Sequence, residues 1–458
     1  MESASSEWHP KPEPGDGPKY LTVLNTLERD IRNGTLAPNE RLPPQRMLAS
    51  HFGVTISTIT KAITEATRRG LVQATPGSGT YVAPAESVPA RARAFVEMGI
   101  NLLPYRQCED LLSASLTGYA ATNRSAELLG YARYRMGPDE AGRKFVDWLY
   151  GQGYGLASGT ILSCHGTQQG LDAALRCVAA PGDTVICEAQ AYTGVLRAVD
   201  QLGLRPHGVA MDAEGVLTEA LDRALAETGA KAVVLTPTAQ NPTGSTMSTE
   251  RRAAIAGLLR RHDVWLIEDA VAAPLTGIDH CSITGLCPDR GIYLTGASKL
   301  VAPGIRFGLI VVPDVLAPRL EAALAITNWT GPSYFGGFLD FLVETGQIDR
   351  IVARYRKDAA MRQALAHRYL GGQQAPSIAY HVWHVLPANA TADAFVGEAA
   401  AANIHLSVAT PFCCPNVAVP NAVRLCLGAE PDLATLEEGL QRLAALQSAP
   451  RFLAAPII

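Results

Sequence analysis

Hydrophobic residues in the first 82 positions recur at the spacing of short helices. From Tyr20 onward they share one helical face, formed by Leu24, Leu27 and Ile31. Asn33-Gly34 is a typical helix stop and ends this first segment. A second, short helix is expected after Pro43-Pro44, ending near Phe52-Gly53.

Thr55 is placed to cap a third helix, whose two faces differ in character. The inward face is hydrophobic and consists of Ile59, Ala62, Ile63 and Ala66. The outward face is polar and consists of Ser57, Lys61, Thr64 and Arg68, with Thr58 near the helix start. Strand-like segments around 71–72 and 80–82 flank a Pro-Gly-Ser-Gly turn and predict a β-hairpin. Three helices followed by a hairpin describe a winged helix-turn-helix.

The third helix of such a module lies in the DNA major groove, and flanking cations contact phosphates. We expect DNA contacts from the outward face, the preceding turn and the tip of the hairpin. The candidates are Arg41, Arg46, Ser57, Thr58, Lys61, Gly77 and Ser78. The alternative is a three-helix interaction domain whose polar face is merely solvated.

After a short linker the pattern changes to alternating strand-like and helix-like segments, which favours an α/β fold. We expect a tail at 1–18 that is disordered, a winged helix-turn-helix at 19–83 and a linker at 84–97. Residues 98–458 form the large domain, with a smaller subdomain from about 345 to 458.

Polar residues follow several buried strand patterns of the large domain. The strand 162–164 leads into Gly166-Thr167-Gln168, which opens a helix and offers N–H groups to an anion. The next two strands end in Asn241-Pro242-Thr243-Gly244 and in Glu268-Asp269. A further strand, 292–294, is followed by Ser298-Lys299 and then Arg306. Taken singly, these are ordinary helix starts, turns and caps.

Together these residues match the needs of one cofactor, pyridoxal phosphate. It requires a lysine for an imine, a carboxylate beside the ring nitrogen and a phosphate cup. It also requires a donor to the ring oxygen and a flat group stacked on the ring. A lysine among other cations should have a depressed pKa, which leaves its amine partly neutral.

Charge is unevenly distributed along the 458 residues, whose formal net charge is -4. Residues 19–82 hold eight lysine and arginine residues against four aspartate and glutamate residues. A small basic module is therefore joined to a larger acidic part of the chain. Basic modules can bind the phosphate backbone of a nucleic acid.

The nine cysteines show no metal-ligand spacing, and the histidines are scattered. No signal-peptide pattern opens the chain, and no hydrophobic run has membrane-spanning length. We therefore expect a cytoplasmic protein with reduced thiols, without a metal site.

The N-terminal segment carries specific sequence motifs in addition to its hydrophobic pattern. Its segments include Arg41-Leu42-Pro43-Pro44-Gln45-Arg46, Phe52-Gly53-Val54 and Gly77-Ser78-Gly79-Thr80-Tyr81-Val82. In these segments, residues 20–82 closely resemble the GntR-type winged helix, which implies binding to double-stranded DNA.

Over about residues 98–448 the chain resembles the fold-type I aminotransferases. The order Gly-Thr-Gln-Gln, Asn-Pro-Thr-Gly, Glu-Asp and Ser-Lys…Arg is similar in sequence and spacing. With its GntR-like head, the whole chain resembles the MocR subfamily of transcriptional regulators. The resemblance implies a mixed, mostly parallel sheet flanked by helices, a smaller C-terminal α/β subdomain and a homodimer.

The resemblance also implies roles for individual residues. Lys299 would form the imine, Asp269 would face the ring nitrogen, Asn241 would bond the ring oxygen and Tyr192 would stack on the ring. The phosphate would be held by Gly166, Thr167, Gln168, Ser298 and Arg306, and by Tyr131 reaching across a dimer interface. Arg424 would clamp a substrate α-carboxylate, to which its bidentate fork is suited.

Two positions depart from the family pattern. A tyrosine often follows the strand-end aspartate in the family, where this chain has Val271 and Ala272. Many relatives carry serine or threonine where this chain has Gly296. We expect the ring oxygen and the phosphate each to lose one hydroxyl donor, while cofactor binding is retained.

Two functions compete for this combination. The first is a regulator that binds DNA and senses pyridoxal phosphate, or an amine or amino acid effector, as an imine at Lys299. The second is an aminotransferase acting on an amino acid, with a secondary DNA-binding head. A third hypothesis, an adaptor that has lost its cofactor, conflicts with the presence of Lys299 and the other residues matched to pyridoxal phosphate.

Overall fold

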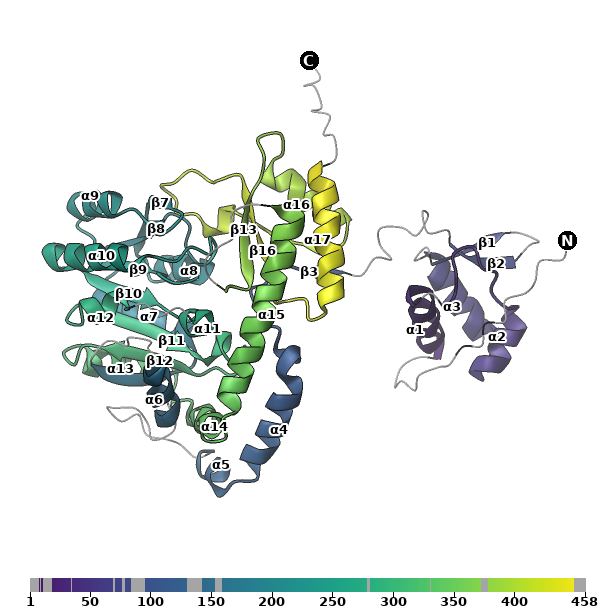
Figure 1. Cartoon of the computed structure of the whole chain (residues 1–458), viewed down its shortest axis with the longest axis horizontal. Coiled ribbons are helices and arrows are strands. Elements are labelled where there is room, and N and C mark those ends of the chain that lie inside the picture. Colours follow the sequence, from purple (N-terminus) through teal and green to yellow (C-terminus); the bar gives the residue numbers. More distant parts are fainter. Residues whose placement is uncertain are drawn as a thin grey trace, which may run out of the picture. The chain divides into compact units, whose positions relative to one another are not determined.

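The protein is described by a computed structural model (Figure 1). The described residues are 8, 10, 19–33, 35–68, 71–75, 79–83, 95–129, 142–152, 159–277, 281–329, 331–371 and 378–448. They form two compact units: residues 1–95 with Glu398–Ile404, and the remainder of the chain. The candidate residues Tyr131, Gly77 and Ser78 lie outside the described residues, as do most of the expected tail and linker.

The first unit contains three helices and a hairpin, in the predicted order. The helices are α1 (Lys19–Arg32), α2 (Gln45–Phe52) and α3 (Ile56–Arg68), and the strands are β1 (Val72–Thr75) and β2 (Gly79–Val82). The strands pair antiparallel, with Val72 opposite Val82. The predicted inward residues Leu24, Leu27, Ile59 and Ala62 are buried together in the core.

Trp8 adds to this core, although it falls in the segment expected to be disordered. Its side chain is 6% exposed, and its indole N–H donates to Asp30 Oδ2 at 2.9 Å. The sequence did not predict this contact. A buried indole is stabilised by such a partner for its polar atom.

A seven-stranded mixed sheet forms the centre of the larger unit. Its spatial order is β4, β12, β11, β10, β9, β5 and β6. The bounds are β4 (Thr160–Cys164), β5 (Thr184–Glu188), β6 (Arg205–Val209), β9 (Ala232–Leu235), β10 (Trp265–Asp269), β11 (Gly291–Gly296) and β12 (Gly308–Val312). Only β12 runs antiparallel to its neighbours, β11 and β4. Continuous burial of β9 and β11 shows that both sheet faces are covered.

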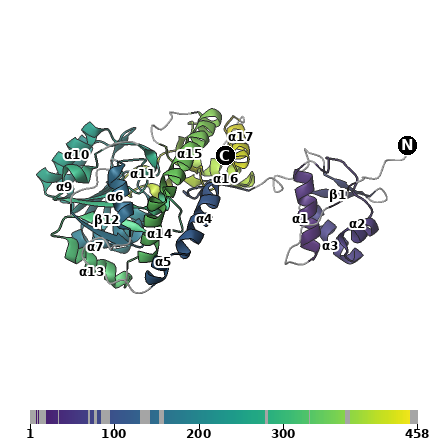
Figure 2. The same cartoon turned by 60° about the horizontal axis from the view of Figure 1, so that its bottom comes forward.

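Helices cover the two faces in distinct groups (Figures 1 and 2). One face packs against α7 (Thr167–Val178), α8 (Thr193–Gln201) and α13 (Ala317–Thr327). The other packs against α9 (Thr218–Thr228), α10 (Thr249–His262) and α12 (Ile283–Leu286). A third cluster on that face involves α4 (Glu109–Ala120), α6 (Arg143–Gly151), α14 (Ser333–Glu344) and α15 (Gln347–Leu370). The unit is therefore a three-layer α/β structure.

A smaller antiparallel sheet lies in the C-terminal part. It consists of β13 (His381–Val385), β16 (Ala422–Cys426) and β15 (Ser407–Val408), in that spatial order. The adjoining helices are α16 (Ala392–Ala401) and α17 (Leu433–Ser448). Near the start of the unit, β3 (Val96–Glu97) pairs with β14 (Ile404–His405).

The remaining short elements connect these layers. They are α5 (Asn123–Glu127), α11 (Ala273–Thr276), β7 (Met211–Asp212), β8 (Gly215–Val216) and the 3-10 turns η2 (Tyr105–Cys108), η3 (Ala297–Lys299) and η4 (Thr410–Phe412). The predicted fold class, a winged helix-turn-helix followed by a mixed α/β domain with a smaller C-terminal sheet, is confirmed.

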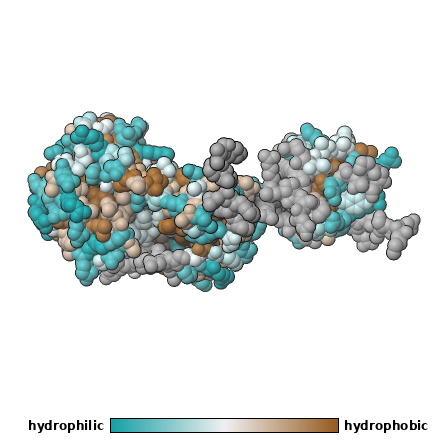
Figure 3. Space-filling view, turned by 90° about the horizontal axis from the view of Figure 1, so that it is seen from above, coloured by the Kyte–Doolittle hydropathy of each residue, from teal (hydrophilic) through white to brown (hydrophobic). Residues whose placement is uncertain are grey.

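Polar and charged residues cover much of the face of the larger unit seen in Figure 3, with hydrophobic residues interspersed. Within the described part of the chain, no helix is long and apolar enough to cross a membrane. The same residues contain no cluster of histidine, cysteine and carboxylate groups able to hold a metal ion. All nine cysteines are free thiols.

Candidate functional site

A cavity of about 550 Å³ opens at the carboxyl ends of the parallel strands of the larger unit. Ligands of open α/β sheets bind at such strand ends. The cavity brings together almost all of the predicted cofactor residues: Thr167, Gln168, Tyr192, Asn241, Asp269, Ser298, Lys299, Arg306 and Arg424. These positions span more than half of the chain, so only folding assembles them.

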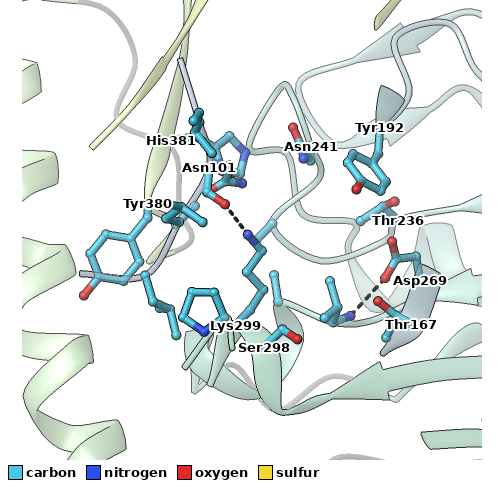
Figure 4. A pocket seen from close by; sticks show the side chains of 18 of the residues that line it. Asn101, Thr167, Tyr192, Thr236, Asn241, Asp269, Ser298, Lys299, Tyr380 and His381 are labelled. Carbon is cyan, nitrogen blue, oxygen red and sulfur yellow. Dashed lines mark hydrogen bonds between the residues drawn. The ribbon is translucent and has the colours of Figure 1, made fainter. Parts of the chain in front are cut away.

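Lys299 lies in η3, directly after β11, and points across the cavity (Figure 4). Its amine donates to the backbone oxygen of Asn101. Burial lowers the Lys299 pKa to about 8, and the charges of Arg424 and Arg306 add to this effect. The amine is therefore partly neutral near physiological pH and able to act as a nucleophile.

Asp269 ends β10 and lies on the other side of the cavity from Asn101 (Figure 4). Its side chain accepts a hydrogen bond from the Val271 backbone N–H at 3.1 Å. Burial raises its pKa to about 6, while that hydrogen bond and the Lys299 charge oppose the shift. At neutral pH the group is still mainly a carboxylate, able to face a cationic ring nitrogen.

Arg424, in β16, is a buried cation that is held by neutral groups. Its Nη1 donates to Asn241 Oδ1 at 2.9 Å and its Nη2 donates to the Gly99 backbone oxygen at 2.7 Å. The guanidinium lies 4.6 Å from the centre of the Phe412 ring, and its buried Nε has no hydrogen-bond partner. None of the described carboxylates forms an ion pair with it. Such a charge is costly to bury unless an anion meets it.

An anion cradle is formed where Gly166 precedes α7. Gly166 has φ of +81°, and a Cβ there would lie 2.4 Å from Arg306 Nη2. Arg306 Nη1 donates to Ser298 Oγ at 3.0 Å. A helix N-terminus, a hydroxyl and a guanidinium thus converge at one place, as a phosphate requires. The positive φ of Gly166 favours glycine, and a Cβ there would require the Arg306 side chain to move.

Tyr192 immediately precedes α8 and lines the cavity. Burial raises the pKa of its phenol, and Asp269 raises it further. The charges of Arg306, Arg424 and Arg197 act in the opposite direction. A Cβ on Gly194 would lie 2.3 Å from the Tyr192 ring, so this glycine permits the ring's position.

Gly296 is explained by packing against the neighbouring strand. A Cβ at this position would lie 2.6 Å from the Phe307 backbone oxygen. A serine or threonine here would therefore require β11 and β12 to separate locally. At the other position that departs from the family pattern, Val271 and Ala272 place apolar groups in the cavity lining.

A polar network in and beside the cavity lining was missed by sequence reasoning. Buried Glu188 accepts hydrogen bonds from Gln240 Nε2 at 2.9 Å and from the Thr236 backbone N–H at 3.0 Å. The Gln240 backbone oxygen is 2.8 Å from His381 Nε2, and Asn101 Nδ2 is 3.3 Å from His381 Nδ1. These partners are distant in sequence and follow no local motif. Burial lowers the His381 pKa to about 4, so the imidazole is neutral.

In the first unit, the predicted DNA-contacting residues differ in their exposure and in their contacts with neighbouring side chains. Ser57 and Arg46 are exposed, and the hydroxyls of Ser57 and Thr58 each lie 2.9 Å from Thr55 Oγ1. The exposed Lys61 has its ammonium 4.2 Å from the centre of the Tyr20 ring. The backbone of Arg41 forms an isolated antiparallel β-bridge with Tyr81 of the hairpin. The polar face of α3 is thus presented to solvent, as a DNA-reading helix requires.

These features define a winged helix-turn-helix joined to an aminotransferase-type domain, and comparison with known proteins agrees. Residues 93–443 match the family described as aminotransferase class I and II, a family of pyridoxal phosphate-dependent proteins, and the chain belongs to it. Residues 19–82 match the bacterial regulatory proteins of the gntR family. This match implies DNA binding by the N-terminal unit.

Several relatives named as transcriptional regulators match most of the chain. The uncharacterized HTH-type transcriptional regulator YdeF of Bacillus subtilis is 27% identical over 457 residues, covering 97% of each chain. The vitamin B6 salvage pathway transcriptional repressor PtsJ of Salmonella typhimurium is 26% identical, covering 69% of this chain and 72% of its own. The probable rhizopine catabolism regulatory protein MocR of Rhizobium meliloti is 25% identical, covering 78% of each.

Solved structures match the larger unit. A kynurenine aminotransferase of Pyrococcus horikoshii superposes with a TM-score of 0.68 at 25% identity, covering 78% of this chain and 92% of its own. An archaeal alanine:glyoxylate aminotransferase gives a TM-score of 0.69 at 21% identity, covering 85% and 94%. The predicted fold-type I architecture is thereby confirmed.

Proposed function

We propose that this protein is a DNA-binding transcriptional regulator whose larger unit binds pyridoxal 5'-phosphate and an amine or amino acid effector. One observation carries the proposal. Lys299, Asp269 and Arg424 line a single cavity in a chain that also carries a GntR-type winged helix. Relatives named as transcriptional regulators, one of them as a vitamin B6 salvage repressor, support it.

The cavity residues fit the proposed cofactor. The close approach of the Arg306 guanidinium to Gly166, at the N-terminus of α7, suits the phosphate. Thr167, Gln168 and Ser298 would complete this cup, and Tyr131 of a second subunit would reach it in a homodimer. Asp269 would face the ring nitrogen, Asn241 the ring oxygen and Tyr192 the ring face. When bound, pyridoxal phosphate supplies an aldehyde and an electron-withdrawing ring.

Lys299 and Arg424 would act on the effector in different ways. The partly neutral Lys299 amine competes with an effector amine for the same aldehyde and can take up the proton that the effector releases. Arg424 offers donors to a carboxylate, which would replace the neutral oxygen atoms of Asn241 and Gly99. These exchanges make the cavity responsive to effector binding.

The segment 96–103, here called the strap, is the part of the chain that leads from the expected linker into the cavity lining. Its Gly99 oxygen accepts from Arg424, and its Asn101 oxygen accepts from Lys299. Ser407 Oγ also donates to the Gly99 oxygen at 3.1 Å. The strap overlaps the end of the expected linker (84–97) and continues beyond it in sequence. An effector that binds Arg424 and displaces Lys299 would change both contacts, as ligand-dependent switching requires.

Operator binding tests the proposal directly. The full chain, with and without pyridoxal 5'-phosphate, is titrated onto fluorescent DNA from upstream of its own and adjacent genes, and anisotropy is measured. We expect specific binding whose affinity changes with cofactor or effector. Absence of specific binding under every condition would contradict the regulatory function. A cytoplasmic location follows from a chromosomal target.

A working aminotransferase is the second candidate, favoured by the complete set of Lys299, Asp269 and Arg424 in one cavity. A panel of amino acids added to the cofactor-loaded chain distinguishes the two. Stoichiometric release of 2-oxo acid and turnover with a second oxo acid would support the enzyme. A stable spectral change without oxo acid release would support the sensor.

A further inference from the structure

The cavity lining carries more positive charge than the proposed cofactor and a simple amino acid require. Among the described lining residues, the charged ones are Arg197, Lys299, Arg306 and Arg424, together with one carboxylate, Asp269. Under the proposed function, Arg306 serves the phosphate, Arg424 the α-carboxylate and Lys299 the aldehyde. Arg197 remains without an assigned anion.

Arg197 reaches the cavity from α8, whose other side is packed into the core. Gly194, Val195, Ala198 and Val199 form the buried side of this helix. Thr193 and Arg197, four residues apart, both line the cavity and share a helix face. The side chain is exposed and therefore lies at the open, solvent-facing part of the cavity rather than at its floor.

No group in the described part of the chain pairs with the Arg197 charge. Among the described residues it forms no ion pair or hydrogen bond, and Asp200, three residues later on α8, does not pair with it. The Arg197 charge nevertheless acts to lower the pKa of the Tyr192 phenol, as do the charges of Arg306 and Arg424. Three guanidinium groups thus act on one ring that lines the cavity.

We infer that Arg197 is a specificity-determining residue, and that the effector carries a second acidic group in addition to its α-carboxylate. A distal carboxylate extending toward the cavity mouth would meet Arg197 while Arg424 holds the α-carboxylate. The planar guanidinium fork is suited to such a bidentate contact. This inference deepens the proposed function and rests on it.

Isosteric pairs of acid and amide test the inference on the full chain loaded with pyridoxal 5'-phosphate. L-Glutamate is compared with L-glutamine, and L-aspartate with L-asparagine, by calorimetric titration. We expect at least one acid to bind about fivefold more tightly than its amide at low salt, as a partly exposed ion pair allows. The preference should shrink at high ionic strength because exposed charges are screened.

Three variants assign the preference to the side chain. Arg197→Gln should bring the acid-to-amide affinity ratio to about one, and Arg197→Lys should retain part of it because the charge is kept. Arg223→Gln, which removes an exposed arginine of α9 outside the cavity lining, should leave the ratio unchanged. The affinity for pyridoxal 5'-phosphate, measured in parallel, should be equal in all four proteins.

Each contrary result overturns the inference. Equal affinities for acid and amide, binding of neither member of both pairs, or an unchanged ratio in Arg197→Gln would each do so. A weaker cofactor affinity in Arg197→Gln with an unchanged ratio would assign the residue to the phosphate. If the unmodified chain takes up no pyridoxal 5'-phosphate, the proposed function itself fails, which is a distinct result.

Discussion

Two ionisable residues of the cavity, Lys299 and Asp269, have pKa values that burial moves toward neutrality. The Lys299 pKa falls to about 8 and the Asp269 pKa rises to about 6. Burial disfavours the charged form of each group, so the two shifts have opposite signs. Between these values, both groups are close enough to their titration ranges to respond to a bound ligand.

The Lys299 pKa leads to a pH prediction for cofactor attachment. Only the neutral amine attacks an aldehyde, and its fraction rises as pH increases through about 8. We expect the attachment rate, followed by absorbance after mixing the chain with pyridoxal 5'-phosphate, to rise with an inflection near pH 8. Lys299→Ala should abolish the absorbance change. An inflection near 10.5, the ordinary pKa of a lysine, would contradict the burial effect.

The Gly166 position leads to a prediction about phosphate binding. Gly166→Ala would place a Cβ 2.4 Å from Arg306 Nη2 in a backbone conformation that favours glycine. We expect the affinity for pyridoxal 5'-phosphate to fall about tenfold, as loss of a charge-assisted hydrogen bond implies. Gly182→Ala is the matched control, because Gly182 has φ of +90° and open space around it. Equal losses in both variants would assign the effect to backbone strain.

At the scale of elements, the strap connects three parts of the larger unit. Its Met98 N–H donates to His405 O at 3.0 Å, and the Cys426 N–H of β16 donates to Met98 O at 2.7 Å. The Gly99 and Asn101 oxygens accept from Arg424 and Lys299. The strap is thus held by the smaller sheet on one side and by cavity residues on the other.

Displacement of the strap should uncouple ligand binding from DNA binding. Gly428→Ala would place a Cβ 2.1 Å from the Leu102 backbone oxygen and force the strap to shift. We expect cofactor affinity to change by less than about threefold, within ~0.7 kcal/mol. The cofactor-dependent change in operator affinity, measured by anisotropy, should decrease.

The control for this experiment is Gly257→Ala in α10, where a Cβ meets nothing within 4 Å. It should retain the full cofactor-dependent response, and alanine should slightly stabilise the helix. An undiminished response in Gly428→Ala, with altered thermal stability, would contradict a transmitting role for the strap.

At the scale of the whole molecule, charge separates the two functions. The basic segment 19–82 contrasts with a chain of net charge -4. Affinity for DNA phosphates should therefore come from the small unit, while the larger unit limits nonspecific attraction.

The salt dependence of DNA binding tests this division. The logarithm of the binding constant should fall linearly with the logarithm of salt concentration, because phosphate contacts release counterions. Arg46→Gln should reduce the slope by about one and weaken binding to all sequences alike. Arg223→Gln, an exposed arginine of the larger unit, should leave the slope unchanged. An equal reduction in both variants would contradict the proposed phosphate contact at Arg46.

Much of the fold was predictable because its patterns are local. The helical spacing of Leu24 and Leu27 and the continuous hydrophobic run of β9 report on each element's own burial. Trp8 was missed because its partner Asp30 lies 22 residues away and the intervening composition is that of a loose tail. Gly296 was interpreted through the cofactor, whereas contact with Phe307 explains it.

The sequence by itself determined the order of elements, the basic head, and the residue types at the strand ends, because periodicity and turn chemistry act over a few residues. Only the tertiary structure decided that Arg424 meets Gly99 and Asn241, that His381 and Gln240 support the cavity, and that Arg197 stands unpaired at its mouth among the described residues. Such contacts join positions up to 325 residues apart, and no local pattern records them. Burial, which sets the Lys299 pKa, arises from the same long-range packing.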